Sequence, residues 1–424
     1  MTAGMKGIPR NPGMDESGMT ACRICGGQIE PFLSFGRMPL ANGFLTADQF
    51  DQEYFFDLVA AFCPSCLMVQ LVDQPDREKM FHAEYPFFSS TSRFQAAHFE
   101  KFANEVSDRW IGRNDPFVVE IGSNDGILLR HFAGAGIRHL GVEPSAGVAS
   151  NARKNGVNTL SGFFEKDIAR QIAAEYGPAD VFLAANCLCH IPCFHSIAEG
   201  VDILLKPRGV VLFEDPYLGD ILEKTSYDQI YDEHVFYFSV LSVNHAFGMH
   251  GMEIVDLWPQ KTHGGSMRYC IARKGTHPVS PAVGVQIGRE RELGLDRIET
   301  YERFRQNCET SQQNLRRILC DLKQQGRRVV GYAATSKSTT VTNYCDLTPD
   351  IVEFISDTTP IKQGKYSPGT HIPVQPYEKF AEAFPDYALL FGWNHKEEIM
   401  AKEQAFLNAG GKWIVYVPKV EVLA

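Results

Sequence analysis

Residues 118–127 constrain the fold of this chain more than any other segment. An apolar run ends in Glu120, and two glycines, Gly122 and Gly126, follow with three residues between them. The pattern predicts a strand, a tight turn and the start of a helix. Glycines at these places let the backbone approach a ligand where a Cβ would collide. In open α/β sheets, such a ligand lies at the carboxyl end of a parallel strand.

The spacing E-x-G-x-N-x-G differs from the dinucleotide fingerprint G-x-G-x-x-G. It suits S-adenosylmethionine, which has no pyrophosphate to hold. A second apolar run ends in Glu143, where an acid can accept both ribose hydroxyls, and a third leads to Asn186. This order is typical of class I methyltransferases. We therefore expect the cofactor to bind at Glu120, Gly122, Asn124, Gly126, Glu143 and Asn186, with Phe163 or Phe164 beside the adenine.

At 424 residues the chain is too long for one core, so two or three domains are expected. A net charge of −10 does not indicate the basic surface that a nucleic-acid-binding protein presents. No apolar run is long enough to cross a bilayer, and the start lacks the apolar segment of a signal peptide. We expect a cytoplasmic protein with no membrane partner, whose residues 1–18 form a disordered leader.

Four of the eleven cysteines form two C-x2-C pairs, Cys22 with Cys25 and Cys63 with Cys66. Two such knuckles complete a four-thiolate zinc site with no open position, so the predicted zinc is structural. The alternative, buried cysteines without a ligand, does not explain two matching spacings. The other seven cysteines form no second pair of knuckles.

The pattern predicts a zinc-binding domain at 19–78, a cofactor-binding domain at 79–285 and a second Rossmann-like α/β domain at 286–424. Strands at 117–121, 138–143, 179–185 and 209–214 alternate with helical segments, which indicates a parallel sheet. We also expect a helix at 94–110, a helical stretch at about 286–325, and strands near 327–335, 351–357 and 387–391. The aromatic and hydroxyl-rich segment 80–92 is expected to be a lid or a loop that faces the substrate.

A histidine flanked by acids, His234 after Tyr231 and Glu233, can serve as a general base with a pKa near neutrality. His190 follows Asn186 closely and should lie at the mouth of the cofactor pocket. Either histidine alone is more often a structural residue than a catalytic one. Together with Tyr85, Tyr231 and Glu233, the two histidines form a donor and acceptor set suited to ionising a C–H acid.

These motifs resemble those of the deoxysugar C-3 methyltransferases of antibiotic biosynthesis. The likeness covers nearly the whole chain from Cys22 and is greatest to members that act on a thymidine-diphosphate (dTDP) 3-amino-4-keto sugar, dTDP-3-amino-2,3,6-trideoxy-4-keto-glucose. It rests on the two cysteine pairs and on the segments 120–126, 186–192, 231–234, 263–266, 335–338 and 357–360.

The resemblance implies a zinc-binding domain, a central S-adenosylmethionine domain and a carboxyl-terminal Rossmann-like domain that helps to hold the nucleotide sugar. It also implies that His234 is the base and that Tyr85, His190, Tyr231 and Glu233 complete the active site. We expect a monomer whose substrate contacts include His263, Ser336, Lys337, Asp357 and Lys362. Lys337 and Lys362 are candidates for the diphosphate, the alternative being that they are solvated lysines.

Two other functions compete with this interpretation. One is an O- or N-methyltransferase for a small acceptor, in which His234 deprotonates oxygen or nitrogen. The other is a zinc-stabilised protein that binds a nucleotide sugar without turnover. The intact cofactor motif argues against this second alternative.

Overall fold

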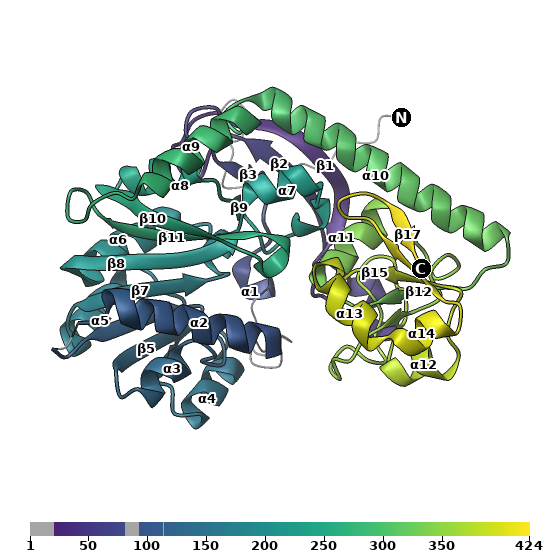
Figure 1. The fold of residues 1–424 in the computed structure, drawn as a ribbon, viewed down its shortest axis with the longest axis horizontal. Coiled ribbons are helices and arrows are strands. Elements are labelled where there is room, and N and C mark those ends of the chain that lie inside the picture. Colours follow the sequence, from purple (N-terminus) through teal and green to yellow (C-terminus); the bar gives the residue numbers. More distant parts are fainter. Residues whose placement is uncertain (1–20, 81–92, 113) are drawn as a thin grey trace, which may run out of the picture.

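The computed structural model describes residues 21–80, 93–112 and 114–424, which form three sheets with helices around them (Figure 1). The predicted leader, Tyr85 and the predicted lid after Met80 lie outside the described residues.

The first sheet is antiparallel and has the strand order β1-β2-β3-β9. Its strands are β1 (Glu30–Pro39), β2 (Phe55–Phe62), β3 (Val69–Leu71) and β9 (Phe236–Tyr237), and η1 (Ala47–Gln52) lies between β1 and β2. Strand β9 comes from the middle of the chain, directly after the acid-flanked histidine, and pairs with β3. The amide of Leu71 also donates to the Val235 carbonyl at 2.9 Å. The amino-terminal sheet therefore fixes the segment that carries His234.

The central sheet has the order β10-β11-β8-β7-β4-β5-β6. Its strands are β4 (Phe117–Ile121), β5 (Arg138–Glu143), β6 (Thr159–Ser161), β7 (Ala179–Ala185), β8 (Leu205–Pro216), β10 (Met252–Gln260) and β11 (Ser266–Arg273). The four strands that the sequence predicts here are confirmed, and they pair in parallel. All five residues of β4 are buried, as a strand covered on both faces requires. The first five strands from β6 to β8 are thus parallel, and β11 and β10 extend them antiparallel.

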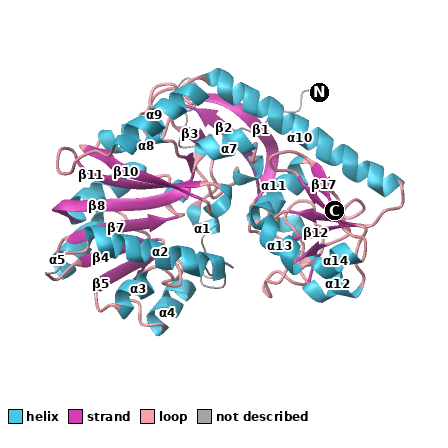
Figure 2. Ribbon diagram, in the orientation of Figure 1, coloured by secondary structure: helices cyan, strands magenta, loops and turns pink. Residues whose placement is uncertain are grey.

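Helices cover both faces of this sheet (Figure 2). The helices between β3 and β11 are α1 (Arg77–Met80), α2 (Arg93–Trp110), α3 (Leu129–Gly134), α4 (Ala146–Lys154), α5 (Lys166–Tyr176), α6 (Phe194–Leu204), α7 (Leu218–Lys224) and α8 (Val240–Gly248), with single turns η3 (Leu188–His190), η4 (Tyr227–Gln229) and η5 (Thr262–Gly264).

The third sheet has the order β14-β13-β12-β15-β16-β17 and is parallel except for β17. Its strands are β12 (Val329–Tyr332), β13 (Ile355–Ser356), β14 (Val374–Gln375), β15 (Tyr387–Leu390), β16 (Lys412–Val415) and β17 (Glu421–Leu423). The accompanying helices are α11 (Ser336–Tyr344), α12 (Tyr377–Glu382), η6 (Trp393–His395), α13 (Lys396–Lys402) and α14 (Gln404–Asn408). The second Rossmann-like unit is therefore confirmed, although β12, β13 and β15 are shorter than the sequence predicts.

The helical stretch predicted at 286–325 is two helices, α9 (Pro281–Leu293) and α10 (Ile298–Gln324). Gly294 ends α9 in the left-handed conformation, with φ of 78°, which a glycine adopts without a steric penalty. Helix α10 then crosses from one lobe of the molecule to the other above β1 (Figure 1). It buries Tyr301, whose ring lies 5.1 Å from that of Phe32 on β1. Within the described part of the chain, no helix combines the length and the apolar character needed to span a bilayer.

Candidate active site

The turn after β4 needs glycine because it packs closely against its neighbours. Gly122 and Gly126 have φ of 58° and 83°. A Cβ added at Gly122 would lie 2.7 Å from the Cβ of Cys187, and one at Gly126 would lie 2.7 Å from Val157. Sequence reasoning assigned these glycines to the approach of a ligand. The structure adds that larger residues in the turn would collide with Cys187, just after β7, and with Val157, just before β6.

Glu143, at the end of β5, anchors the same turn. Its two carboxylate oxygens accept the backbone amides of Asn124 at 2.9 Å and Ser145 at 2.8 Å. Burial raises the pKa of Glu143, and the two backbone hydrogen bonds oppose that rise. The carboxylate thus shapes the turn and also lines the cavity described next.

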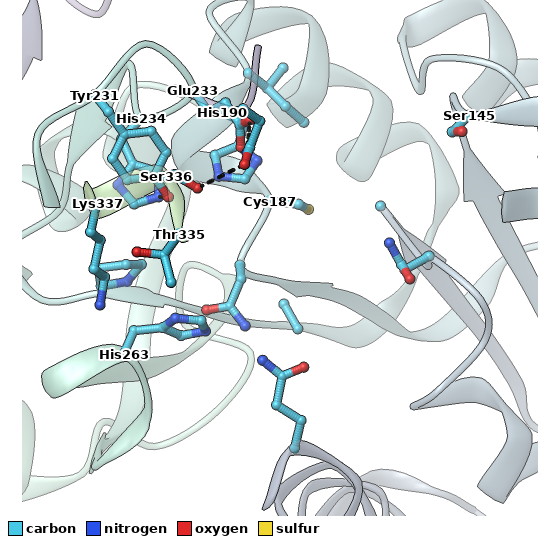
Figure 3. Close-up of a pocket in the computed structure, with 18 of the residues that line it drawn as sticks. Ser145, Cys187, His190, Tyr231, Glu233, His234, His263, Thr335, Ser336 and Lys337 are labelled. Atoms are coloured by element: carbon cyan, nitrogen blue, oxygen red, sulfur yellow. Dashed lines mark hydrogen bonds between the residues drawn. The ribbon is translucent and has the colours of Figure 1, made fainter. Parts of the chain in front are cut away.

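A cavity of about 420 Å³ extends from this turn to the carboxyl-terminal domain. Figure 3 shows Ser145 on one side of it and His234, Ser336 and Lys337 on the other, with Cys187 between them. The predicted site residues that line it are Gly122, Asn124, Glu143, Phe163, Phe164, Asn186, His190, Tyr231, Glu233, His234, His263, Ser336, Lys337 and Lys362.

Three predicted residues within the described chain, Glu120, Gly126 and Asp357, do not line the cavity. Glu120 is 3% exposed, and burial, followed by the charge of Glu143, raises its pKa well above the usual value. Asp357 accepts the amides of Ala334 and Thr359, both at 2.7 Å, and so shapes the loop that precedes α11.

His234 carries its proton on Nδ1, which leaves Nε2 able to act as a base. Its Nδ1 lies 2.9 Å from the Gln229 carbonyl, which can only accept, so Nδ1 carries the hydrogen. Nε2 therefore accepts from the Tyr231 hydroxyl at 2.8 Å. Burial lowers the pKa of His234 well below the usual value, whereas the flanking acids had predicted a pKa near neutrality. The imidazole is neutral at physiological pH, with a lone pair on Nε2.

Two more neutral histidines complete this part of the cavity wall. The ring of His190 stacks on that of His234, with centroids 5.2 Å apart and planes at 17°. Burial lowers the pKa of His190 to about 4. His263 lies on η5 with φ of 53°, and burial, followed by the charge of Lys337, lowers its pKa to about 3. These side chains can donate or accept hydrogen bonds without bringing a positive charge.

The carboxyl-terminal domain brings two lysines to the cavity, beside the start of α11. Thr335 caps this helix by accepting the Ser338 amide. Lys337 is only 9% exposed, so it is not a solvated lysine; its Nζ lies 3.3 Å from Asn394 Oδ1. Lys362 donates to the Ala334 carbonyl at 2.8 Å. Burial lowers the pKa of both lysines.

The four predicted zinc ligands lie together. Their Sγ atoms are within 4.8 Å of one another, with Cys22 3.5 Å from Cys66 and Cys25 3.4 Å from Cys63. Tetrahedral zinc with bonds of 2.3 Å separates its sulfur ligands by about 3.8 Å. The amides of Ile24 and Gly27 point at the sulfurs of Cys22 and Cys25. This donor set fits zinc and would leave it no open position.

Three family models match consecutive parts of the chain. Residues 22–81 match a model described as "Putative zinc binding domain", residues 93–257 match "Methyltransferase domain", and residues 261–418 match "C-methyltransferase C-terminal domain". The chain is also 35% identical to the C-methyltransferase NovU of Streptomyces niveus, over 95% of this chain and 96% of that protein.

The chain belongs to the C-methyltransferase family. The predicted resemblance is confirmed at this level, and so are the class I methyltransferase fold, S-adenosylmethionine as cofactor and zinc in the amino-terminal domain. The fold also resembles solved methyltransferases at low similarity. Among them are CcbJ from Streptomyces caelestis (14% identity, TM-score 0.32, 41% of this chain and 89% of that chain) and ChlM from Synechocystis PCC 6803 (15%, 0.32, 43% and 82%).

Several residues of this candidate site were missed by sequence reasoning. Asn42, Arg77, Asn394 and His395 line the cavity although they belong to none of the motifs. The Arg77 guanidinium lies 4.1 Å from the centroid of the Phe163 ring. No local pattern marks these residues, because they come from loops and helix ends of three separate parts of the chain.

Proposed function

We propose that the enzyme methylates C-3 of a dTDP-linked 4-keto-deoxysugar in deoxysugar and antibiotic biosynthesis. The observation that carries this proposal is His234, a neutral base in the same cavity as the turn at Gly122 and the buried Lys337. A C–H acid needs a base of this kind, because a cationic imidazole has no lone pair for the proton.

The ketone at C-4 acidifies the proton on C-3. His234 Nε2 takes that proton, and the electron pair of the C–H bond moves into the enolate. Tyr231, displaced from Nε2 by the substrate, and His190 can each donate a hydrogen bond to the enolate oxygen, which stabilises the developing charge. S-adenosylmethionine, when bound, would supply the methyl group, and the cavity would hold C-3 beside it. The new C–C bond would form as the methyl–sulfonium bond breaks, with S-adenosylhomocysteine as the leaving group.

The nucleotide end fits the carboxyl-terminal side of the cavity. Lys337, Lys362 and Ser336 stand where α11 begins, and a helix start offers backbone amides and a positive dipole to phosphate groups. His263 faces the same space as a neutral donor for the sugar. We assign these residues to the diphosphate and the sugar of the acceptor.

Hydrogen–deuterium exchange at C-3 tests the proposal. The acceptor is incubated with enzyme in deuterated solvent without methyl donor, and replacement of the C-3 proton by deuterium is measured. His234→Gln should slow the exchange by about 10² to 10⁴, the usual contribution of a general base, while both ligands still bind. Exchange that survives in His234→Gln and is lost in His190→Gln would reverse the two roles. Wild-type enzyme that exchanges no C-3 proton and methylates an oxygen or nitrogen would establish the alternative O- or N-methyltransferase.

We further propose the 3-amino sugar, dTDP-3-amino-2,3,6-trideoxy-4-keto-glucose, as the preferred acceptor, on the resemblance described above. Competition between the 3-amino and 3-hydroxy sugars tests the choice. Turnover of the 3-hydroxy sugar alone would overturn it. The monomeric state and the cytoplasmic location stay predictions.

A further inference from the structure

Asn42 links all three parts of the molecule at the cavity. It lies in the turn after β1, and its Nδ2 donates to Glu233 Oε1 at 2.7 Å. Its Oδ1 accepts from the Ser336 hydroxyl, at the start of α11, at 3.4 Å. Figure 3 shows the two partners of Asn42, Glu233 and Ser336, on the same side of the cavity. One amide therefore connects the amino-terminal domain, the acid beside His234 and the carboxyl-terminal domain.

The backbone next to Asn42 is clamped from both sides. The Ala41 amide donates to Asp232 Oδ1 at 3.0 Å, and the Ala41 carbonyl accepts from Thr339 Oγ1 at 2.8 Å. Ala41, Asp232 and Thr339 are each 2% exposed. The turn is therefore held by the segment of Asp232 and by helix α11 together, and these contacts fix the position of the Asn42 side-chain amide.

Glu233 needs such a partner. It is 3% exposed, and a charged carboxylate at that depth is costly unless hydrogen bonds or opposite charges compensate it. Burial lowers the pKa of Lys362, and the charges of Asp357 and then Glu233 oppose that fall. An amide donor bound to Oε1 stabilises the ionised form and fixes the orientation of the carboxylate beside His234.

We propose that Asn42 is a positioning residue of the reaction, so that the zinc-binding domain supplies a working part of the active site. This inference rests on the proposed function, since it assumes that Glu233 acts in the acceptor site. Asn42 holds the Glu233 carboxylate in its working orientation and links it to the helix start that faces the nucleotide sugar.

The test measures C-3 proton exchange at saturating acceptor, together with the KM of the acceptor. Asn42→Ala should slow the exchange by about tenfold to a hundredfold, the effect of losing one hydrogen bond to a charged group. Asn42→Asp keeps the shape but sets a second carboxylate against Glu233, so it should slow the exchange further. In a Glu233→Ala background, Asn42→Ala should add little, because no carboxylate remains to be held.

Thr339→Val is the matched control. It removes a hydrogen bond that joins the same turn to the same helix, but Thr339 does not line the cavity. We expect a lower melting temperature and an exchange rate within about twofold of wild type. Calorimetry with S-adenosylmethionine verifies that each variant is folded.

The outcomes separate the inference from the proposed function. If Thr339→Val slows exchange as much as Asn42→Ala, the effect is domain docking and the inference is wrong. The same holds if Glu233→Ala slows exchange and Asn42→Ala does not. If Glu233→Ala leaves exchange at the wild-type rate, the assumed role of Glu233 in the proposed function fails first.

Discussion

Replacing Arg268 with methionine should destabilise the central domain by about 3–5 kcal/mol, the usual cost of removing one partner from a buried ion pair. Arg268, on β11, donates to Glu214 Oε2 through Nε at 3.0 Å and Nη2 at 2.7 Å. The side chains are 2% and 0% exposed. Methionine keeps much of the packing against Phe102, whose ring lies 3.5 Å from the guanidinium, but leaves the Glu214 charge without its strongest cation.

The pKa of Glu214 gives a second route to the magnitude. Burial alone would raise it, but the hydrogen bond from His98 and the charge of Arg268 lower it from 4.5 to about 2. A shift of that size corresponds to about 3 kcal/mol of stability at neutral pH. The two routes therefore agree on the order of the effect.

The pH dependence has a definite sign. Because the folded pKa lies below the unfolded one, this contribution is present above pH 4.5 and is lost as the pH falls toward 2. Without Arg268, burial favours the protonated acid, so the variant should gain relative stability on acidification. The difference between wild type and variant should shrink as the pH is lowered from 7.

Denaturant unfolding followed by the fluorescence of Trp110 and Trp258, both in the central domain, measures the loss. Arg170→Met is the control, because its ion pair with Asp167 is 57% and 89% exposed and should be worth under about 1 kcal/mol. A loss in Arg268→Met no larger than in this control would refute a charged, compensated Glu214. The Glu214 carbonyl also accepts the Asn186 amide at 2.6 Å, so affinity for S-adenosylmethionine should fall in parallel.

Three further predictions concern the two cofactors. Metal analysis should find about one zinc per chain, lost together with solubility in Cys22→Ser, because four thiolates close its shell; soluble, metal-free wild-type protein would contradict this. Glu143→Ala should weaken S-adenosylmethionine binding by about 1–3 kcal/mol in calorimetry. It removes the carboxylate predicted to accept the ribose hydroxyls, together with its hydrogen bonds to the backbone amides of Asn124 and Ser145. Unchanged affinity would mean that the cofactor lies elsewhere. Gly122→Ala should lower both the melting temperature and cofactor affinity, because its Cβ meets Cys187 at 2.7 Å, and the further change Cys187→Gly should restore part of the loss.

Local patterns were enough for much of the architecture. Continuous apolar runs that end in Glu120, Glu143 and Asn186 predicted three parallel strands of the central sheet, since a strand buried on both faces must be apolar throughout. Two matching cysteine pairs predicted the four-cysteine zinc site. Each of these signals lies within a short segment, where the number of residues between two positions fixes how far apart they lie in the folded chain.

The tertiary structure decided what the segments do together. The sequence could not show that β9 joins the amino-terminal sheet and so fixes the loop of His234, or that a turn beside β1 brings Asn42 to Glu233, 191 residues away. It also could not show that Glu120 and Asp357 do not line the cavity. Such contacts depend on packing between surfaces far apart in the chain, and no residue type or local spacing encodes them.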